Sequence, residues 1–163
     1  MKKVLIIIFL VFLFCSCGIN YKQARQIIKN PKKDYTGIDT IIRINGYYYN
    51  QRIDGIHYPF FLKTNGEFLI YKYNLNSKKK FEEDVFTFNI PDKGYYDISN
   101  DTLKIIYAGK FQIFSYDIYS INFIILNDST LKAISFSANG GEIELLDKIF
   151  EFQEFNIEKL SNK

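Results

Sequence analysis

Few residues in this chain have the types and spacing that catalysis would need. His57 is the only histidine, so a histidine-based nucleophilic triad and a metal site with several histidine ligands are both excluded. Paired carboxylates could carry out glycoside hydrolysis, in which one group acts as an acid and the other as a base or nucleophile. The candidate groups are Glu82-Glu83-Asp84, Asp97 with Asp101, and Glu142 with Glu144.

Each of these acidic groups also has a structural explanation. The first lies in a charged loop, the second belongs to a predicted hairpin and its turn, and the third precedes an apolar run. The chain has no tryptophan, the usual platform of carbohydrate-processing sites, and Asn139-Gly140-Gly141 lacks the Lys and Ser/Thr of a phosphate-binding loop. We therefore predict no catalytic residues, no metal ion and no cofactor, and we keep a glycan-acting enzyme only as the least favoured hypothesis.

The N-terminal residues have the pattern of a secretory leader. Met1-Lys2-Lys3 is followed by an unbroken apolar run over residues 4–14 and then by Cys15-Ser16-Cys17. As a helix, eleven residues would cover about 17 Å, against about 30 Å for the hydrocarbon core of a bilayer. The run is too short to span a membrane, which favours a signal peptide over a retained anchor.

The residues before Cys17 resemble the lipobox of bacterial lipoproteins. Ser16 supplies the small residue that precedes the modified cysteine, whereas the bulky Phe14 disfavours Cys15. The resemblance implies cleavage before Cys17 and its acylation with chains such as palmitate, so that membrane lipid anchors the mature protein. An ordinary secretory cut near Ser16 remains the alternative. Gly18 stands where Asp would retain a lipoprotein in the inner membrane, which favours the outer membrane with the protein facing the periplasm.

These features divide the chain into a signal peptide (1–16), a lipid-anchored tether or short helix (17–39) and a β domain (40–163). Without Lys2 and Lys3, the 21 lysines and arginines fall to 19, against 18 acidic residues. Binding to nucleic acid depends mainly on positive charge that contacts phosphates. A nearly neutral domain is therefore predicted to have no nucleic-acid partner.

The β domain is rich in tyrosine, phenylalanine and isoleucine, which favours sheet over helix. Its clearest hairpin is predicted to turn at Asn100-Asp101. That turn pairs Ile98 with Leu103 and Tyr96 with Ile105 on an apolar face, and Asp97 with Lys104 on the opposite face.

A second hairpin is predicted at Asn65-Gly66, the strongest short turn signal in the chain. With a two-residue turn, Phe60, Leu62, Leu69 and Tyr71 share one face. Further strands are predicted at 40–51, 85–88, 110–119, 120–126, 131–136 and 148–157. Residues 142–150 fit either a strand or a helix.

About eight short antiparallel strands in sequence predict an all-β meander, closed as a barrel or folded as a β-sandwich. The layout of residues 40–157 resembles that of lipocalin-like (calycin) barrels, with Gly46-Tyr47-Tyr48 in the place of their Gly-x-Trp signature. The resemblance is one of layout, and it implies an internal cavity for a small apolar ligand.

The surplus of aromatic residues is the other feature that indicates a function. We predict that Tyr48, Phe60, Tyr71 and Tyr96 line a ligand cavity, which makes the protein a non-catalytic binder of a small apolar ligand. Two alternatives remain open. The rings could fill the barrel themselves, or an aromatic patch or strand edge could dock an envelope protein in an interaction or accessory role.

Overall fold

A computed structural model describes residues 24, 26, 37–50, 56–57, 59–71, 73–74, 91–112 and 115–155. The leader, Cys17, the acidic group at 82–84 and the strand predicted at 85–88 lie outside these residues. Of the predicted tether, Ala24 and Gln26 are described as helical, and residues 38–39 belong to a short 3-10 helix, η1 (Ile38–Thr40).

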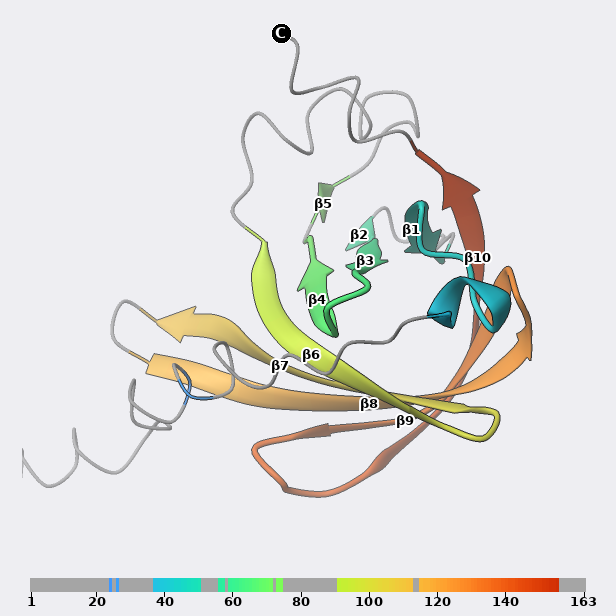
Figure 1. Ribbon diagram of the computed structural model, residues 1–163. Coiled ribbons are helices and arrows are strands. Elements are labelled where there is room, and N and C mark those ends of the chain that lie inside the picture. Colours follow the sequence, from blue (N-terminus) through green and yellow to red (C-terminus); the bar gives the residue numbers. More distant parts are fainter. Residues whose placement is uncertain are drawn as a thin grey trace, which may run out of the picture.

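The chain forms a closed antiparallel barrel of eight strands, as the barrel prediction required (Figure 1). Its strands, in spatial order, are β1 (Gly46–Tyr49), β10 (Glu144–Glu154), β9 (Thr130–Ala138), β8 (Ser115–Asn127), β7 (Thr102–Gln112), β6 (Asp92–Ser99), β4 (Glu67–Ile70) and β3 (Phe60–Leu62). β2 (Ile56–His57) and β5 (Tyr73–Asn74) form a separate two-stranded sheet. The alternative of a β-sandwich is wrong, because β1 pairs with both β10 and β3 and closes the sheet on itself.

The hairpin of β6 and β7 has the predicted register. Ile98 lies opposite Leu103, Tyr96 opposite Ile105, and Asp97 opposite Lys104. Asn100 adopts a positive φ of 53°, a conformation that asparagine tolerates in a tight turn. The pleat sends Leu103 and Ile105 into the core while Asp97 and Lys104 are exposed, so local turn chemistry and burial specify the same register.

The hairpin of β3 and β4 turns differently from the prediction. Phe60 lies opposite Ile70, and Leu62 opposite Phe68, so the loop has three residues rather than two. Gly66, at a φ of 77°, supplies the left-handed residue that such a loop requires. The pairing of β3 with β4 is therefore shifted by one residue from the predicted register. This shift places Leu69 and Tyr71 on the face opposite Phe60, so the predicted grouping of these side chains is wrong.

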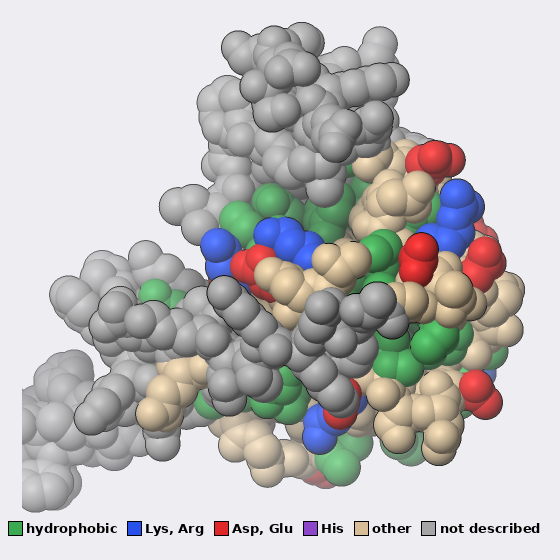
Figure 2. Space-filling view, viewed as in Figure 1, with side chains coloured by type: hydrophobic (Ala, Val, Ile, Leu, Met, Phe, Trp, Pro, Cys, Tyr) green, Lys and Arg blue, Asp and Glu red, His purple; other side chains and the backbone are tan. Residues whose placement is uncertain are grey.

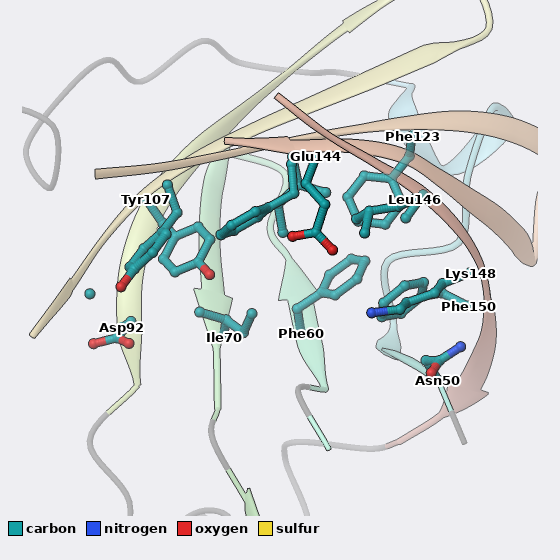
Figure 3. A pocket seen from close by; sticks show the side chains of 15 residues that line it. Asn50, Phe60, Ile70, Asp92, Tyr107, Phe123, Glu144, Leu146, Lys148 and Phe150 are labelled. Atoms are coloured by element: carbon teal, nitrogen blue, oxygen red, sulfur yellow. The ribbon is translucent and has the colours of Figure 1, made fainter. Parts of the chain in front are cut away.

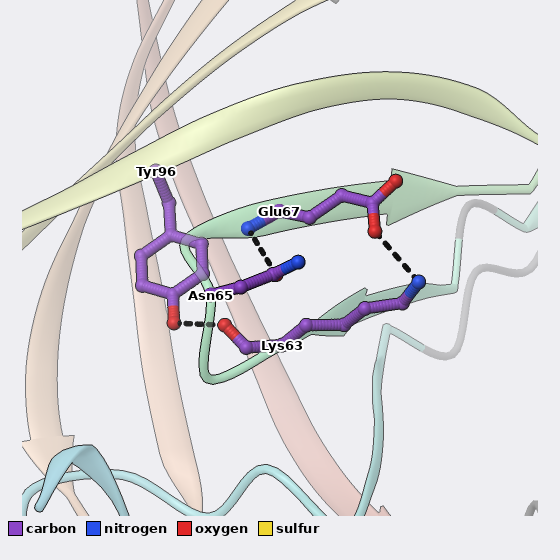
Figure 4. Close-up of polar contacts among 4 residues, drawn as sticks. All are labelled: Lys63, Asn65, Glu67 and Tyr96. Atoms are coloured by element: carbon purple, nitrogen blue, oxygen red, sulfur yellow. Dashed lines mark hydrogen bonds and ion pairs between the residues drawn. The ribbon is translucent and has the colours of Figure 1, made fainter. Parts of the chain in front are cut away.

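Local hydrogen bonds hold this turn (Figure 4). The Asn65 side-chain Oδ1 accepts a hydrogen bond from the Glu67 amide at 3.0 Å, and Lys63 Nζ lies 2.6 Å from Glu67 Oε2. The Tyr96 hydroxyl donates to the Lys63 carbonyl at 2.6 Å. Two of these contacts lie within the turn, and the third connects the turn to Tyr96 on β6.

Three other predicted elements need correction. The strand expected over 40–51 is limited to β1, because η1 and the residues after it precede β1. The stretch 110–119 contains the end of β7 and the start of β8 rather than one strand. Residues 144–150 belong to strand β10, so the helical alternative is wrong there.

η1 brings two apolar side chains to the core. The amides of Ile41 and Ile42 both donate to the Ile38 carbonyl at 2.9 Å, and Thr40 bonds to the Gly37 carbonyl. Ile38 and Ile42 are buried against the residues that fill one end of the barrel. The turn at η1 thus brings Ile38 and Ile42, four residues apart, to the same core.

The β3–β4, β6–β7 and β8–β9 turns lie at the same end of the barrel, which we call the closed end. There the Arg43 amide donates to the Asp128 carbonyl at 2.8 Å, and the Arg43 guanidinium lies 4.7 Å from the centre of the Phe152 ring. The core at this end is filled by Ile38, Ile42, Tyr48, Leu103, Leu131 and Phe152, among others.

A bulge in β9 decides which side chains face the barrel interior near the other end. Asn122 pairs with Ser135 and Phe123 with Ala133, which leaves Ile134 as an extra residue. Without this extra residue, alternation would point Ser135 inward after Ala133. With it, the next side chain after Ala133 to point inward is that of Phe136. The bulge therefore supplies an aromatic ring where simple alternation predicts a serine.

The outer surface carries charges of both signs. Figure 2 shows acidic and basic side chains interspersed over the face it presents, without a large region of one sign. Exposed apolar residues occur mainly on β8 and near the start of β10, where Leu145 is 84% exposed and Ile143 is 66% exposed. Among the described residues, no helix is long and apolar enough to cross a bilayer.

Candidate ligand-binding cavity

Among the described residues, the barrel interior holds a cavity at the end opposite the closed end. Its volume is about 390 Å³, and it is bounded by side chains from seven of the eight barrel strands and by Asn50, which follows β1 (Figure 3). Of the lining residues, Phe60, Phe123 and Ala133 also belong to the buried core, and Phe150 packs against it. They separate the cavity from the packed core of the closed end and form its floor.

The floor is a group of aromatic rings in mutual contact. The ring of Phe60 lies 5.5 Å from that of Phe123 and 5.6 Å from that of Phe150, and Phe123 and Phe150 meet edge to face at 5.4 Å. Tilted and edge-to-face arrangements are those that aromatic pairs prefer. The floor is therefore a continuous apolar surface of rings in contact.

One wall of the cavity is a row of rings on neighbouring strands, which we call the ring wall. Tyr107 on β7 lies 5.0 Å from Tyr119 on β8, and Tyr119 stacks at 5.7 Å and 23° on Phe136 of β9. Phe136 reaches this row because of the bulge at Ile134. The ring wall offers a continuous π surface to a flat or apolar ligand.

Two glycines make room for this ring wall. A Cβ at Gly94 would lie 2.0 Å from the Ile106 carbonyl oxygen and 2.5 Å from the Tyr107 Cα. A Cβ at Gly109 would lie 2.8 Å from the Tyr119 ring. The absence of a side chain at both positions lets the strands and the Tyr107 and Tyr119 rings come close together.

Polar groups surround the mouth of the cavity. Asp117 accepts a hydrogen bond from the Tyr119 hydroxyl at 3.3 Å and another from Asn139 Nδ2 at 2.8 Å. The Asn139 Oδ1 in turn accepts from the Ile118 amide at 2.8 Å. This network fixes the β9–β10 turn to β8 and orients Tyr119 in the ring wall. On the other side of the mouth, Asn50 donates from Nδ2 to the Ile149 carbonyl.

Three charged side chains line the cavity. They are Asp92 on β6, and Glu144 and Lys148 on β10. Figure 3 shows Glu144 and Lys148 both turned into the cavity, with Asp92 at the opposite side. The cavity thus combines an apolar floor and ring wall with a few charges, the composition that small-molecule sites commonly have.

Of the four residues predicted to line a cavity, only Phe60 does so. Tyr48 and Tyr96 point into the barrel but lie at the closed end, where each hydroxyl donates to a backbone carbonyl: that of Asp128 at 3.0 Å and that of Lys63 at 2.6 Å. Burial raises the pKa of both phenols well above 10, so they stay protonated and keep these hydrogen bonds. These two tyrosines are part of the packed core.

Tyr71 lies outside the barrel interior. It belongs to a second buried cluster with Tyr47 and Phe61, and the Tyr71 ring meets that of Phe61 edge to face at 5.6 Å. Burial is also the main cause that raises the pKa of the Tyr71 phenol. The three-residue loop at Asn65-Gly66 explains this placement, because it puts Tyr71 on the face opposite Phe60.

Most of the cavity residues that sequence reasoning missed lie on β6 to β10, and the others are Ile70 on β4 and Asn50 after β1. Glu144, Leu146, Lys148 and Phe150 are every second residue of β10 up to Phe150, so a strand interpretation places them on one face. The sequence of 142–150 also fits a helix, and this alternative hid the signal. For Phe136 no simple signal existed, since the bulge at Ile134 breaks the alternation.

The candidate catalytic residues do not meet in this cavity. Asp97 is exposed opposite Lys104, Asp101 lies in the β6–β7 turn, and Glu142 precedes β10; only Glu144 lines the cavity. His57 lies in β2, and its side chain is outside the described part. Within the described ranges, no group of three or more His, Cys, Asp or Glu side chains could hold a metal ion.

Fold and site together define a single antiparallel eight-stranded β-barrel with an internal cavity at one end. No protein-family model, no curated protein and no solved structure matches this chain.

Proposed function

We propose that the β domain is a non-catalytic binder of a small apolar ligand, which it holds in the cavity at the end of the barrel opposite the closed end. The observation that carries this proposal is a cavity of about 390 Å³ with an aromatic floor and ring wall. That volume falls within the usual range of small-molecule sites, about 300–1,000 Å³. A barrel filled throughout by its own side chains would have argued against a ligand, and here the packing is limited to the closed end.

A tryptophan scan of β10 tests whether the cavity is the binding site. Leu146 lines the cavity, whereas Ile149 on the same strand faces outward and is 41% exposed. We expect Leu146→Trp to fill part of the cavity and to weaken binding of the apolar dye phenylnaphthylamine by about tenfold or more, because the bulky indole takes the place of the dye. The measurement is a fluorescence titration of each variant with the dye.

Ile149→Trp is the matched control, since it adds the same side chain to the outer face. It should bind the dye within about twofold of the wild-type protein. Equal affinity of the two variants would mean that the dye binds elsewhere, and a wild-type protein that does not bind it would contradict the proposal.

We further propose that Cys17 is acylated and anchors this domain to the bacterial envelope. The anchor lies in the outer membrane, and the domain faces the periplasm. The support is the lipobox-like sequence that ends at Cys17. In a bacterial host fed an alkyne analogue of palmitate, the full-length protein should be labelled and should sediment with membranes. Cys17→Ser should abolish both, while Cys15→Ser, the matched control, should leave both unchanged. Labelled, membrane-bound Cys17→Ser would show that the anchor lies elsewhere.

A further inference from the structure

Lys148 is an unusual residue for the wall of an apolar cavity. It lies opposite Ala133 in the β9–β10 ladder, on the face of β10 that also carries Leu146 and Phe150. Its side chain is half-buried, and Figure 3 shows its ammonium on the cavity side. Partial burial of a charge beside aromatic rings is unfavourable unless a group of opposite charge or a hydrogen-bond acceptor compensates it.

No such partner for Lys148 is seen in the described part of the chain. The outer face of the same two strands offers a direct comparison, because there Lys132 Nζ lies 2.8 Å from Asp147 Oδ1. The outward lysine thus has a carboxylate within hydrogen-bonding distance, and the inward lysine is not joined to either carboxylate of the cavity. An anionic group that enters the cavity would supply a compensating charge for Lys148.

The two carboxylates of the cavity do not take this role. Glu144 is exposed at the mouth, four residues before Lys148 on the same strand, a separation of about 13 Å along an extended backbone. Asp92 starts β6, on the side of the cavity opposite Lys148 in Figure 3, and it has interactions of its own. Both acids would repel an anion near the mouth, so they favour an orientation in which the anionic group lies at Lys148.

We propose that Lys148 makes the cavity selective for ligands that join a planar apolar or aromatic body to one anionic group. The anionic group pairs with the Lys148 ammonium, and the body lies against the ring wall of Tyr107, Tyr119 and Phe136. This inference rests on the proposed function and adds the charge of the ligand to it.

Two dyes with the same ring system separate the two proposals. Anilinonaphthalene sulfonate carries an anionic group, and phenylnaphthylamine is the same molecule without it. In the full-length protein, Lys148→Met should weaken binding of the sulfonate by about tenfold, the loss of one charge-assisted contact, and should change binding of the neutral dye by less than about twofold. Lys148→Arg should keep the preference, and Lys132→Met, the matched outer-face control, should bind both dyes as the wild-type protein does.

Each outcome has one meaning. If Lys148→Met changes the affinities for both dyes equally, or changes neither, the selectivity for anions is wrong while the cavity remains the binding site. If Lys148→Met does not fold, as judged by circular dichroism, Lys148→Gln takes its place with the same expected tenfold loss. If the wild-type protein binds neither dye, or if Leu146→Trp binds them unchanged, the proposed function itself fails.

Discussion

Phe60→Ala is expected to lower the free energy of unfolding by about 3–5 kcal/mol, the usual range for truncating a fully buried phenylalanine. Phe60 is only 2% exposed. Its ring centre lies 5.4 Å from those of Tyr48 and Phe68, and 5.5 and 5.6 Å from those of Phe123 and Phe150. Removal of this ring leaves a void that the surrounding rings cannot fill, because each is held by its own strand. Urea unfolding followed by circular dichroism measures the loss.

Ile124→Ala serves as the control for this experiment. Ile124 lies on β8 next to the buried Phe123, but it faces outward and is 38% exposed. Its truncation should change the free energy of unfolding by no more than about 0.5 kcal/mol. A loss below about 1 kcal/mol for Phe60→Ala would mean that Phe60 does not join the floor of the cavity to the closed-end core.

The same residue shows how the sequence predicted part of the site. The surplus of aromatic residues predicts a lining role for Phe60, and Phe60 does line the cavity. The same surplus predicts a lining role for Tyr48 and Tyr96, but their hydroxyls need acceptors when buried, and backbone carbonyls at the closed end supply them. Composition indicates that rings are buried, whereas their depth in the barrel depends on pairing between distant strands.

Register was predictable where one turn type fitted the residues and not where two did. At Asn100-Asp101 the two-residue turn agrees with the charge pair of Asp97 and Lys104, so both signals gave the observed pairing. At Asn65-Gly66 the aromatic residues occupy both faces of β3 and β4, so the apolar pattern fits either loop length, and Lys63 and Glu67 form their ion pair across the three-residue loop. The three-residue loop forms there because Gly66 takes the left-handed conformation and the Asn65 side chain accepts the Glu67 amide.

Charges were the hardest part of the site to predict. The spacing of Glu142 and Glu144 suggests a catalytic pair, but β10 begins at Glu144, so only Glu144 lies on the strand and lines the cavity. The sequence does not tell Lys132 and Lys148 apart, since each is followed directly by an apolar residue, Ala133 and Ile149 respectively. Only the strand pairing shows that one lies beside Asp147 on the outer face and the other beside the aromatic floor.

Gly94 is the position where a single methyl group should disturb both stability and binding. It lies on β6 opposite Tyr107, and an added Cβ would lie 2.0 Å from the Ile106 carbonyl oxygen and 2.6 Å from the Tyr107 Cβ. The nearest atom is backbone, so rotation of a side chain cannot relieve the clash. Gly94→Ala is expected to lower the free energy of unfolding by about 3 kcal/mol, at the upper end of the range for overpacking. Urea unfolding measures this loss.

Gly141→Ala is the control that separates this clash from the general effect of replacing a glycine. A Cβ at Gly141 would meet only the Ala138 carbonyl oxygen, at 3.2 Å, in an exposed turn, so its effect should stay within about 1 kcal/mol. Because the Gly94 clash pushes directly on Tyr107, a folded Gly94→Ala protein should also bind phenylnaphthylamine more weakly, whereas Gly141→Ala should bind it normally. Wild-type stability and wild-type binding of Gly94→Ala would contradict the close approach of β6 and β7 at Tyr107. The structural reason for a glycine at this position would then also be wrong.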